Sequence, residues 1–225
     1  MIPQRYSDEI SQRLTGRHKK SLKLLFALHS SLVLDIGCYN GWLEYYFYKE
    51  NCSPIIGIDL EENYLKMAKQ HAPSAHYLLA SGLNLPFRLN SFHAVVAFDV
   101  LEHLLKDQEI VFLNESYKTL RSNGTMILST PNDALTLKLV DPAWLFGHRH
   151  YSKTVLCSFL NKTQFSIIDL ESRGGFYENF SMLLFYPFKL MGREIPLKSY
   201  FDRQRDFEYL EMNTGKSTVF LTIRK

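Results

Sequence analysis

The sequence predicts an α/β fold built on a seven-stranded, mostly parallel sheet with helices on both faces and an antiparallel strand at the C-terminus. Three observations predict this fold. Short, almost continuous apolar runs recur up to Pro131, and segments with helical spacing separate them. Several of these runs end in an acidic or polar residue. After Pro131 the rhythm changes, and a β-rich run closes the chain. Continuous apolar strands that alternate with helices are typical of a parallel sheet covered on both faces.

The first part of the chain carries the parallel strands. A helix over Ser21–His29 is expected to lead into them. The expected strands are Leu32–Ile36, Pro54–Leu60, Ala75–Ala80, Phe92–Val100 and Thr125–Pro131. The expected helices between them are Trp42–Glu50, Glu61–Gln70 and Gln108–Arg121. Asn123 and Gly124 are residues that favour a helix C-terminus, so we expect them to end the last of these helices.

The second part is expected to contain a helix over Lys153–Asn161, a strand over Phe165–Glu171 and the final strand Thr218–Arg224. The insertion between these two strands, residues 172–217, is far longer than a hairpin loop. It is rich in aromatic residues and predicts a helix over Tyr177–Phe185. This helix either packs on the core or on a second subunit of a homodimer, or forms a lid over an apolar substrate pocket. It lacks the lysine-rich face of a membrane-surface helix.

Composition sets further bounds. A chain of 225 residues with 46% hydrophobic and 22% charged residues fits one globular domain over residues 1–225. The net charge of +3 gives no clear signal for nucleic acid. Three scattered cysteines argue against a disulfide framework or a zinc cluster. The polar N-terminus is unlike a signal peptide, and no stretch is apolar enough to span a bilayer, so we expect a cytoplasmic protein.

Unusual residues collect where the expected strands end. Asp35 and Asp59 close the first two strands, and Asp99, Glu102 and His103 follow the fourth. Ligands of open α/β sheets bind beyond the carboxyl ends of the strands. Glycines after the first strand let the backbone approach a ligand. An acid about 20 residues beyond such a turn suits a ribose diol, because two hydroxyls can donate to its two oxygens.

Five blocks of sequence resemble the motifs of the class I S-adenosylmethionine-dependent methyltransferases. They span roughly residues 22–171 and occur in the family's order. The blocks are VLDIGCYNG (Val33–Gly41), GIDL (Gly57–Leu60), LNLPFRLNSF (Leu83–Phe92), AFDVLEHL (Ala97–Leu104) and LRSNGTMILSTPN (Leu120–Asn132). Each block alone is weak, but five in order are specific. The resemblance implies a Rossmann-like fold with S-adenosylmethionine as cofactor.

The resemblance also implies roles for individual residues. The methionine end of the cofactor would lie against Asp35 and the backbone of Gly37 and Gly41, and Asp99 would flank it. Asp59 would hold the ribose hydroxyls, and Ser81 and Gly82 would border adenine. Cys38 and Leu60 complete the implied cofactor-binding set.

Three positions depart from the family pattern. Tyr39 replaces the middle glycine of the first motif, Ser81 stands where an aspartate often reads the adenine amino group, and His93 replaces a frequent aspartate. S-adenosylmethionine carries no phosphate that must lie against the backbone. A side chain at position 39 is therefore compatible with this cofactor, whereas the pyrophosphate of a dinucleotide would require more glycines.

Histidines beyond the fourth and fifth strands are the candidate catalytic residues. A hydroxyl or protonated amine acceptor needs a base, and histidine suits this role near neutral pH. We select His103 and, from the run GHRHYS (Gly147–Ser152), His150; His148 is its close alternative. The structural alternative for this run is a loop in which Ser152 caps the next helix.

A metal site is a further alternative. DVLEH (Asp99–His103) resembles the E-x-x-E-H segment of ubiquinone-pathway and small-RNA methyltransferases that bind a metal. Glu102, His103 and His148 or His150 would form a reasonable oxygen and nitrogen ligand set. The same LEH is also common in members without a metal, and Asp99 is shorter than the usual glutamate. The predicted set of site residues therefore contains no metal ligand.

Three functional hypotheses follow. The leading one is O- or N-methylation of a small-molecule acceptor, apolar or sugar-linked, at the expense of S-adenosylmethionine. The second is a degenerate member of the family that serves as a binding or scaffold protein, which the residues at positions 39 and 81 motivate. The third, a nicotinamide-dependent enzyme, is disfavoured because the chain lacks a full G-x-G-x-x-G motif.

Overall fold

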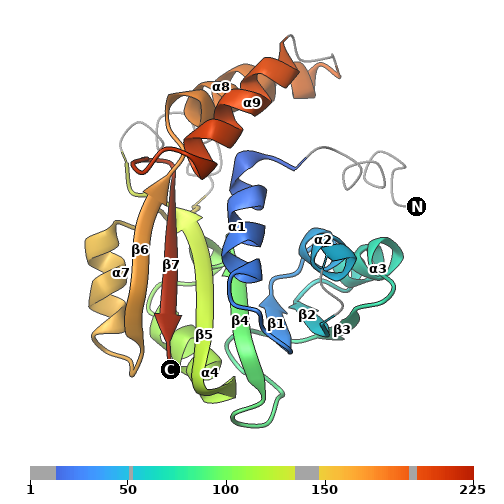
Figure 1. Cartoon of the computed structure of the whole chain (residues 1–225), viewed down its shortest axis with the longest axis vertical. Helices are drawn as coiled ribbons and strands as arrows, with labels where there is room; N and C mark the ends of the chain where they lie inside the picture. The colour runs from blue at the N-terminus through green and yellow to red at the C-terminus, as the bar shows by residue number, and fades with distance from the viewer. Residues whose placement is uncertain (1–13, 51–52, 135–146, 193–196) are drawn as a thin grey trace.

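The computed structural model describes residues 14–50, 53–134, 147–192 and 197–225. It contains a seven-stranded sheet in the order β3-β2-β1-β4-β5-β7-β6 (Figure 1). Strands β1 to β5 pair in parallel, and β7 runs antiparallel to both β5 and β6. The predicted fold class is confirmed, including the antiparallel strand at the C-terminus.

The boundaries of most elements lie close to those expected. The strands are β1 (Val33–Ile36), β2 (Ile55–Asp59), β3 (His76–Leu79), β4 (Phe92–Phe98), β5 (Leu120–Pro131), β6 (Ser166–Arg173) and β7 (Thr218–Arg224). The helices are α1 (Gly16–Phe26), α2 (Trp42–Glu50), α3 (Glu62–His71), η2 (Leu101–His103), α4 (Glu109–Thr119), α7 (Lys153–Leu160), α8 (Phe176–Leu190) and α9 (Lys198–Leu210). Ser152 caps α7, because its hydroxyl accepts from the Val155 amide at 3.2 Å.

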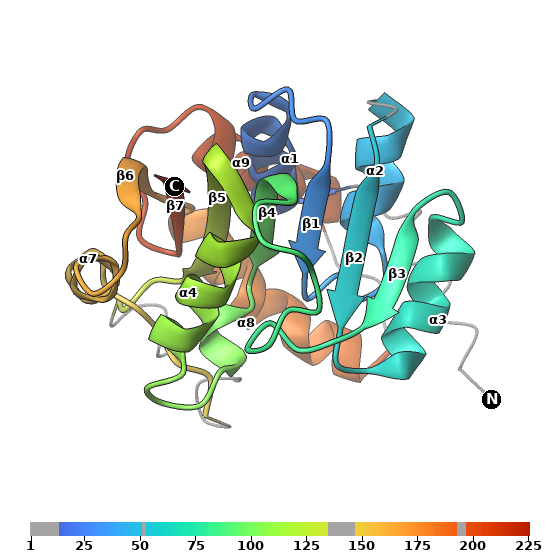
Figure 2. The ribbon, with the colours of Figure 1, turned by 90° about the horizontal axis from the view of Figure 1, so that it is seen from below.

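Successive side chains of β1 point to opposite faces of the sheet and pack into two separate hydrophobic cores. Leu34 and Ile36 pack with Phe112 of α4 and Leu156 of α7 on one face of the sheet. Val33 points to the other face, where α1 and α2 supply a list of apolar partners: Leu22, Leu25, Leu43 and Phe47. Figure 2 shows the strands from β6 to β3, with α4 and α7 on one side and α1 and α2 on the other. Helices therefore cover both faces of the sheet.

The predicted end of the fourth helix is wrong. We expected the helix to run to Arg121 and stop at Asn123 and Gly124, but α4 ends at Thr119 and β5 begins at Leu120. Leu120 is extended and fully buried, and it pairs with Phe92 of β4. Asn123 does adopt a positive φ of 63°, but it does so inside β5. Burial of Leu120 in the sheet therefore sets the boundary between α4 and β5, and the turn-forming Asn123 and Gly124 do not.

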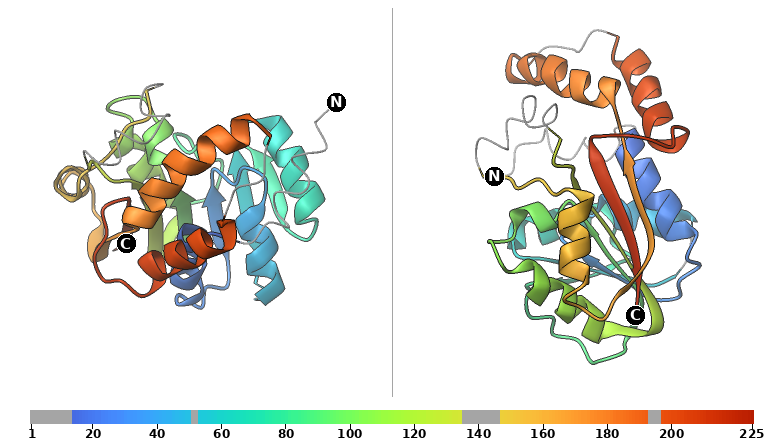
Figure 3. Two further views of the ribbon diagram at one scale, coloured as in Figure 1. Left: turned by 90° about the horizontal axis from the view of Figure 1, so that it is seen from above. Right: turned by 90° about the vertical axis from the view of Figure 1, so that its left-hand side faces the viewer.

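The insertion contains two helices where one was expected. Helix α8 covers more than the predicted 177–185, and α9 was not predicted. Both lie above the sheet, at the end to which the β5 arrow points (Figures 1 and 3). The Glu208 carboxylate of α9 accepts from the amides of Gly175, Tyr177 and Glu178 at the start of α8. Arg205 pairs with Glu178 at 2.5 Å. Charged groups therefore join the two helices.

Among the described residues, the helices are all too short or too polar to cross a membrane.

Candidate active site

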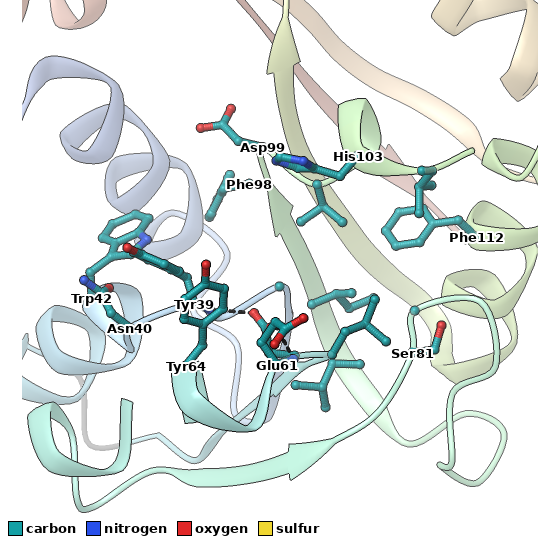
Figure 4. Close-up of a pocket in the computed structure, with 18 of the residues that line it drawn as sticks. Tyr39, Asn40, Trp42, Glu61, Tyr64, Ser81, Phe98, Asp99, His103 and Phe112 are labelled. Carbon is teal, nitrogen blue, oxygen red and sulfur yellow. Dashed lines mark hydrogen bonds between the residues drawn. The ribbon is translucent and has the colours of Figure 1, made fainter. Parts of the chain in front are cut away.

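A cavity of about 910 Å³ opens at the carboxyl ends of β1 to β4. Six of the predicted cofactor-binding residues line it: Gly37, Asp59, Leu60, Ser81, Gly82 and Asp99. Asp35, Cys38 and Gly41 do not line it. Figure 4 shows the lining side chains converging from the β1 turn, the β2 end, the β3 end and the β4 end. The structure thus brings together most of a set that is scattered over the sequence.

The turn after β1 forms one wall of the cavity. Gly37, Tyr39 and Gly41 all have positive φ, at 78°, 49° and 78°. The amides of Gly37 and Cys38 donate to the Ile58 carbonyl, which holds the turn against β2. A Cβ at Gly37 would lie 2.6 Å from Cγ2 of Val100. Glycine is therefore needed at position 37, because a side chain would close the gap between the turn and the β4 end.

Tyr39 faces the cavity. Its ring makes an edge contact with Tyr64 of α3, with ring centroids 4.6 Å apart, and both rings line the cavity. The bulky residue in the glycine turn is thus part of the cavity wall. A ligand in the cavity can therefore contact its ring.

Asp59 ties the turn to β2 and also faces the cavity. Its Oδ2 accepts from the Tyr39 amide at 3.0 Å, and its Oδ1 accepts from the Glu61 amide at 3.0 Å (Figure 4). A carboxylate oxygen has capacity for more than one hydrogen bond. Both oxygens can therefore accept from a ligand while the turn holds them in place.

Ser81 and Gly82 follow β3 and line the opposite side. The Ser81 Oγ accepts from the Leu83 amide at 3.2 Å. A Cβ at Gly82 would lie 2.8 Å from the ring of Phe112, which is fully buried. Leu60, at the end of β2, is 70% exposed although it is apolar. These residues line the cavity next to Asp59.

Asp99 and His103 line the cavity at the end of β4. The His103 ring makes an edge contact with His148, with ring centroids 4.4 Å apart. Burial lowers the pKa of His103, and the neighbouring His148 lowers it further. Arg149 donates to Glu109 at 2.6 Å, which fixes the loop that carries His148 against the start of α4. His150, the predicted partner, does not line the cavity, and its neighbour His148 is the residue that contacts His103.

Glu102 is buried and does not line the cavity. It is 3% exposed and accepts from the Thr130 hydroxyl at 3.1 Å. Burial, and then the charge of Asp99, raises its pKa well above the ordinary value. Within the described ranges, histidines, cysteines and acids do not gather in groups of three or more that could hold a metal.

Asp35 lies beneath the turn as one half of a buried acid pair. Asp35 is 3% exposed, and Glu44 of α2 is fully buried. Asp35 pairs with Gly57 of β2, and a Cβ at Gly57 would lie 2.4 Å from the Glu44 Oε1. Burial raises the pKa of Asp35 to about 7 and raises that of Glu44 as well. No cation in the described part of the chain forms a salt bridge with either carboxyl, so burial favours their protonated forms.

Several residues that line the cavity lie outside the sequence motifs. They come from the two helices that flank the glycine turn, α1 and α2: Arg17, His18, Trp42 and Tyr46. Asn40 lines the cavity from the turn itself. The Oδ1 atom of Asn40 is buried without a hydrogen-bond partner among the described residues. Sequence reasoning missed Arg17 and His18, because only the packing of α1 brings them to the cavity. Trp42 directly follows Gly41, so its place after the motif was a usable signal.

Comparison with known proteins agrees with this geometry. Residues 34–128 match the family described as "Methyltransferase domain". A ubiquinone biosynthesis O-methyltransferase from Pelagibacter ubique (strain HTCC1062) is 30% identical over 106 residues. That match covers 46% of this chain and 43% of the relative, so the chain spans less than half of the length of that relative.

Solved structures share the fold at low identity. A SAM-dependent methyltransferase from Archaeoglobus fulgidus is 14% identical, with a TM-score of 0.67 and full coverage of both chains. The N-methyltransferase NodS from Bradyrhizobium japonicum WM9, solved with S-adenosyl-L-homocysteine, is 15% identical, with a TM-score of 0.61 and coverage of 93% and 86%. The [4+2]-cyclase SpnF is 20% identical, with a TM-score of 0.64 and coverage of 90% and 80%.

The sheet order, the glycine turn and the acid at the end of β2 define a Rossmann-like fold with a ligand site at the carboxyl ends of its strands. Together with the match of residues 34–128 to a methyltransferase domain, they make this part of the chain similar to the S-adenosylmethionine-dependent methyltransferases.

Proposed function

We propose that this protein transfers a methyl group from S-adenosylmethionine to a small-molecule acceptor, by O- or N-methylation. The observation that supports this most directly is the single cavity shared by Gly37, Asp59, Ser81, Gly82 and Asp99. These residues come from four strand ends, in the order that the family motifs imply. The name of SpnF describes a different reaction, so the fold alone does not decide the activity.

The residues of the cavity fit this cofactor. Asp59 would accept from the two ribose hydroxyls. The flat adenine ring would lie against the part of the cavity lined by Leu60, Ser81 and Gly82, with the Ser81 hydroxyl as a polar contact in place of an acid. The Gly37 backbone lines the cavity and would lie against the methionine end, and Asn40, whose Oδ1 has no hydrogen-bond partner among the described residues, lines the same part of the cavity.

The bound cofactor would supply an electrophilic methyl group on a good sulfonium leaving group. The protein would then mainly position and desolvate the acceptor. Since the pKa of His103 is lowered, its imidazole is neutral at pH 7 and can take a proton from the acceptor. We assign the base role to His103, whose pKa burial lowers and the neighbouring His148 lowers further. His150 lies outside the cavity, and we give it no direct role.

The acceptor would bind beside α1 and α2. Trp42, Tyr46 and Phe98 line this part of the cavity, and the Trp42 and Phe98 rings lie 6.3 Å apart. A volume of about 910 Å³ lies near the upper end of the range for ligand sites, so cofactor and small acceptor can share it. The aromatic lining favours an acceptor with an apolar or ring-shaped part, which includes a sugar.

We propose that the insertion acts on the site indirectly. Among its described residues, none lines the cavity. A Cβ at Gly16 would lie 2.5 Å from the Arg205 carbonyl oxygen, so α1 packs closely on α9. The insertion thus supports α1, and α1 in turn lines the cavity.

The proposal is tested by calorimetric titration with S-adenosylhomocysteine and, in parallel, with NAD. We expect S-adenosylhomocysteine to bind and NAD to show no saturable heat. Failure of S-adenosylhomocysteine to bind at millimolar concentration would overturn the proposal. Preferential binding of NAD would support the nicotinamide-dependent alternative.

A binding protein without catalysis is the second candidate, because Ser81 replaces an acid and its Oγ already accepts from the Leu83 amide. The variant His103→Gln separates the two candidates. An acceptor is first found by screening metabolites for release of S-adenosylhomocysteine. If the protein is an enzyme, His103→Gln should then lower kcat at least about tenfold and leave the Kd for S-adenosylhomocysteine unchanged. Absence of any turnover with the parent protein across the screen would favour the binding protein.

A further inference from the structure

One wall of the cavity combines aromatic rings with a guanidinium group. The His18 and Trp42 rings make an edge contact with centroids 4.6 Å apart, and the Trp42 and Phe98 rings lie 6.3 Å apart. Arg17, which precedes His18 in α1, lines the same cavity. Trp42 lies on the opposite side of the cavity from Ser81 (Figure 4). The family resemblance assigns neither Arg17 nor these rings to the cofactor, so this wall is available to the acceptor.

Arg17 is the only cationic side chain at the cavity among the residues that the structure describes. The acidic residues that line the cavity are Asp59, Glu61 and Asp99. Burial lowers the pKa of His18 to about 3, so its ring is neutral, and burial also lowers the pKa of His103. An acidic ligand is repelled by the carboxylates and attracted by the guanidinium. Within this wall, Arg17 is therefore the group that can accommodate an acid.

Asp99 fixes the Arg17 side chain in this wall and leaves part of it accessible. The Arg17 Nη1 lies 2.9 Å from the Asp99 Oδ2, and the Ser129 hydroxyl donates to the Asp99 Oδ1 at 3.0 Å. The Arg17 side chain is still 35% exposed. A guanidinium presents several N–H donors in a planar fork, so it can bind a second carboxylate while the contact with Asp99 persists.

We propose that Arg17 binds a carboxylate of the methyl acceptor, and that the acceptor is an aromatic acid whose ring lies against Trp42 and Phe98. This inference rests on the proposed function and specifies the class of its acceptor. Planar guanidinium groups bind carboxylates with two parallel hydrogen bonds, which fix the orientation of the acid as well as its position. Aromatic side chains pack edge to face or offset against a flat ring. Arg17 would thus position the acceptor and select acids over their neutral analogues.

The test compares aromatic acids with their neutral amides as methyl acceptors. The panel contains the ortho, meta and para isomers of hydroxybenzoate and aminobenzoate, each beside its carboxamide, and turnover is followed by release of S-adenosylhomocysteine. We expect at least one acid to be methylated, with kcat/KM about 10- to 100-fold above that of its amide, because a charged hydrogen-bonded contact is gained. Equal rates for acids and amides, faster methylation of the amides, or no turnover of any acid would overturn the inference.

Arg17→Met should abolish the preference for the acid by raising its KM, while kcat for the acid and KM for the amide change little. Arg17→Lys keeps the charge without the planar fork and should recover part of the loss. Lys23→Met is the matched control, because Lys23 is exposed on the same helix and does not line the cavity. A preference that survives in Arg17→Met contradicts the inference. If Arg17→Met does not fold, the comparison of acids with amides in the parent protein still decides.

Binding of S-adenosylhomocysteine separates this inference from the proposed function. By calorimetry, the parent protein and Arg17→Met should bind S-adenosylhomocysteine with the same Kd, because Arg17 is assigned to the acceptor. A weaker Kd in a folded Arg17→Met would place the guanidinium at the cofactor and overturn the inference. A parent protein that binds S-adenosylhomocysteine and does not prefer acids would overturn the inference alone. A parent protein that does not bind S-adenosylhomocysteine would overturn the proposed function itself.

Discussion

Replacing Gly41 with alanine is expected to lower the free energy of unfolding by about 2–5 kcal/mol. Gly41 has a φ of 78°, where a non-glycine residue costs about 1–2 kcal/mol. A Cβ at this position would also lie 2.8 Å from the Cα of Ala68 and 3.0 Å from the Tyr77 hydroxyl. Because Ala68 belongs to α3, the clash is with backbone, and overpacking of this kind adds about 1–3 kcal/mol.

Chemical denaturation of Gly41→Ala and of Gly192→Ala measures this effect. Gly192 has a φ of 64°, and nothing lies within 4 Å of its added Cβ. Gly192→Ala therefore carries the conformational cost alone and should destabilise by only about 1–2 kcal/mol. Equal losses of unfolding free energy in the two variants would contradict the prediction that the close contact between α3 and Gly41 adds to the cost. Gly41→Ala should also weaken ligand binding, because α3 carries Tyr64 of the cavity wall.

The parallel half of the fold could be predicted because its signals are local. Buried strands such as β4 read as continuous apolar runs, and Phe92–Phe98 is buried or half-buried throughout. The candidate site followed from the same logic, since polar residues at parallel strand ends must meet at one edge of the sheet. Asp59 and Asp99 are far apart in sequence and line one cavity for this reason.

Helix α9 could not be predicted because its burial depends on charge pairing. Of its buried residues, Asp202 and Glu208 are acids. Glu208 is buried because it accepts three amides at the start of α8, and Asp202 faces Lys198 and Arg205. A hydrophobic pattern cannot show burial that depends on partners in another helix. The role of Arg17 as a cavity-lining residue could not be predicted for the same reason, because it depends on packing between α1 and α9.

The acid pair under the glycine turn should make the protein less stable as the pH rises. The pKa of Asp35 is raised to about 7 and that of Glu44 is raised as well, whereas their ordinary values are 3.8 and 4.5. Between about pH 4 and pH 7, the folded state therefore binds more protons than the unfolded state. The contribution of this pair to stability must therefore fall with rising pH over this range, because the carboxyls of the unfolded state ionise first.

Glu44→Gln is expected to remove part of this loss. Glutamine keeps the shape of the side chain and cannot ionise, so at pH 8 the variant should be more stable than the parent by about 1–3 kcal/mol. This corresponds to roughly 2–4 °C in Tm for each kcal/mol. At pH 4 to 5, where the Glu44 carboxyl of the parent is protonated, the two proteins should melt at similar temperatures.

Thermal melts at pH 5 and pH 8 provide the measurement, with Glu62→Gln as the control. Glu62 lies on the surface of α3, where its side chain is 69% exposed. Glu62→Gln therefore removes the same charge, but it does not remove a buried carboxyl. The buried, neutral His18 has the opposite pH dependence, but it is present in parent and variants alike and cancels from the comparison. Parallel pH profiles for the parent and Glu44→Gln would contradict the prediction. The Cys38 thiol and the Tyr77 hydroxyl, which face the pair, would then have to stabilise an ionised Glu44 against the charge of Asp59. A profile that flattens only in Glu44→Gln would show that the fold keeps a protonated acid beneath the turn that lines its ligand site.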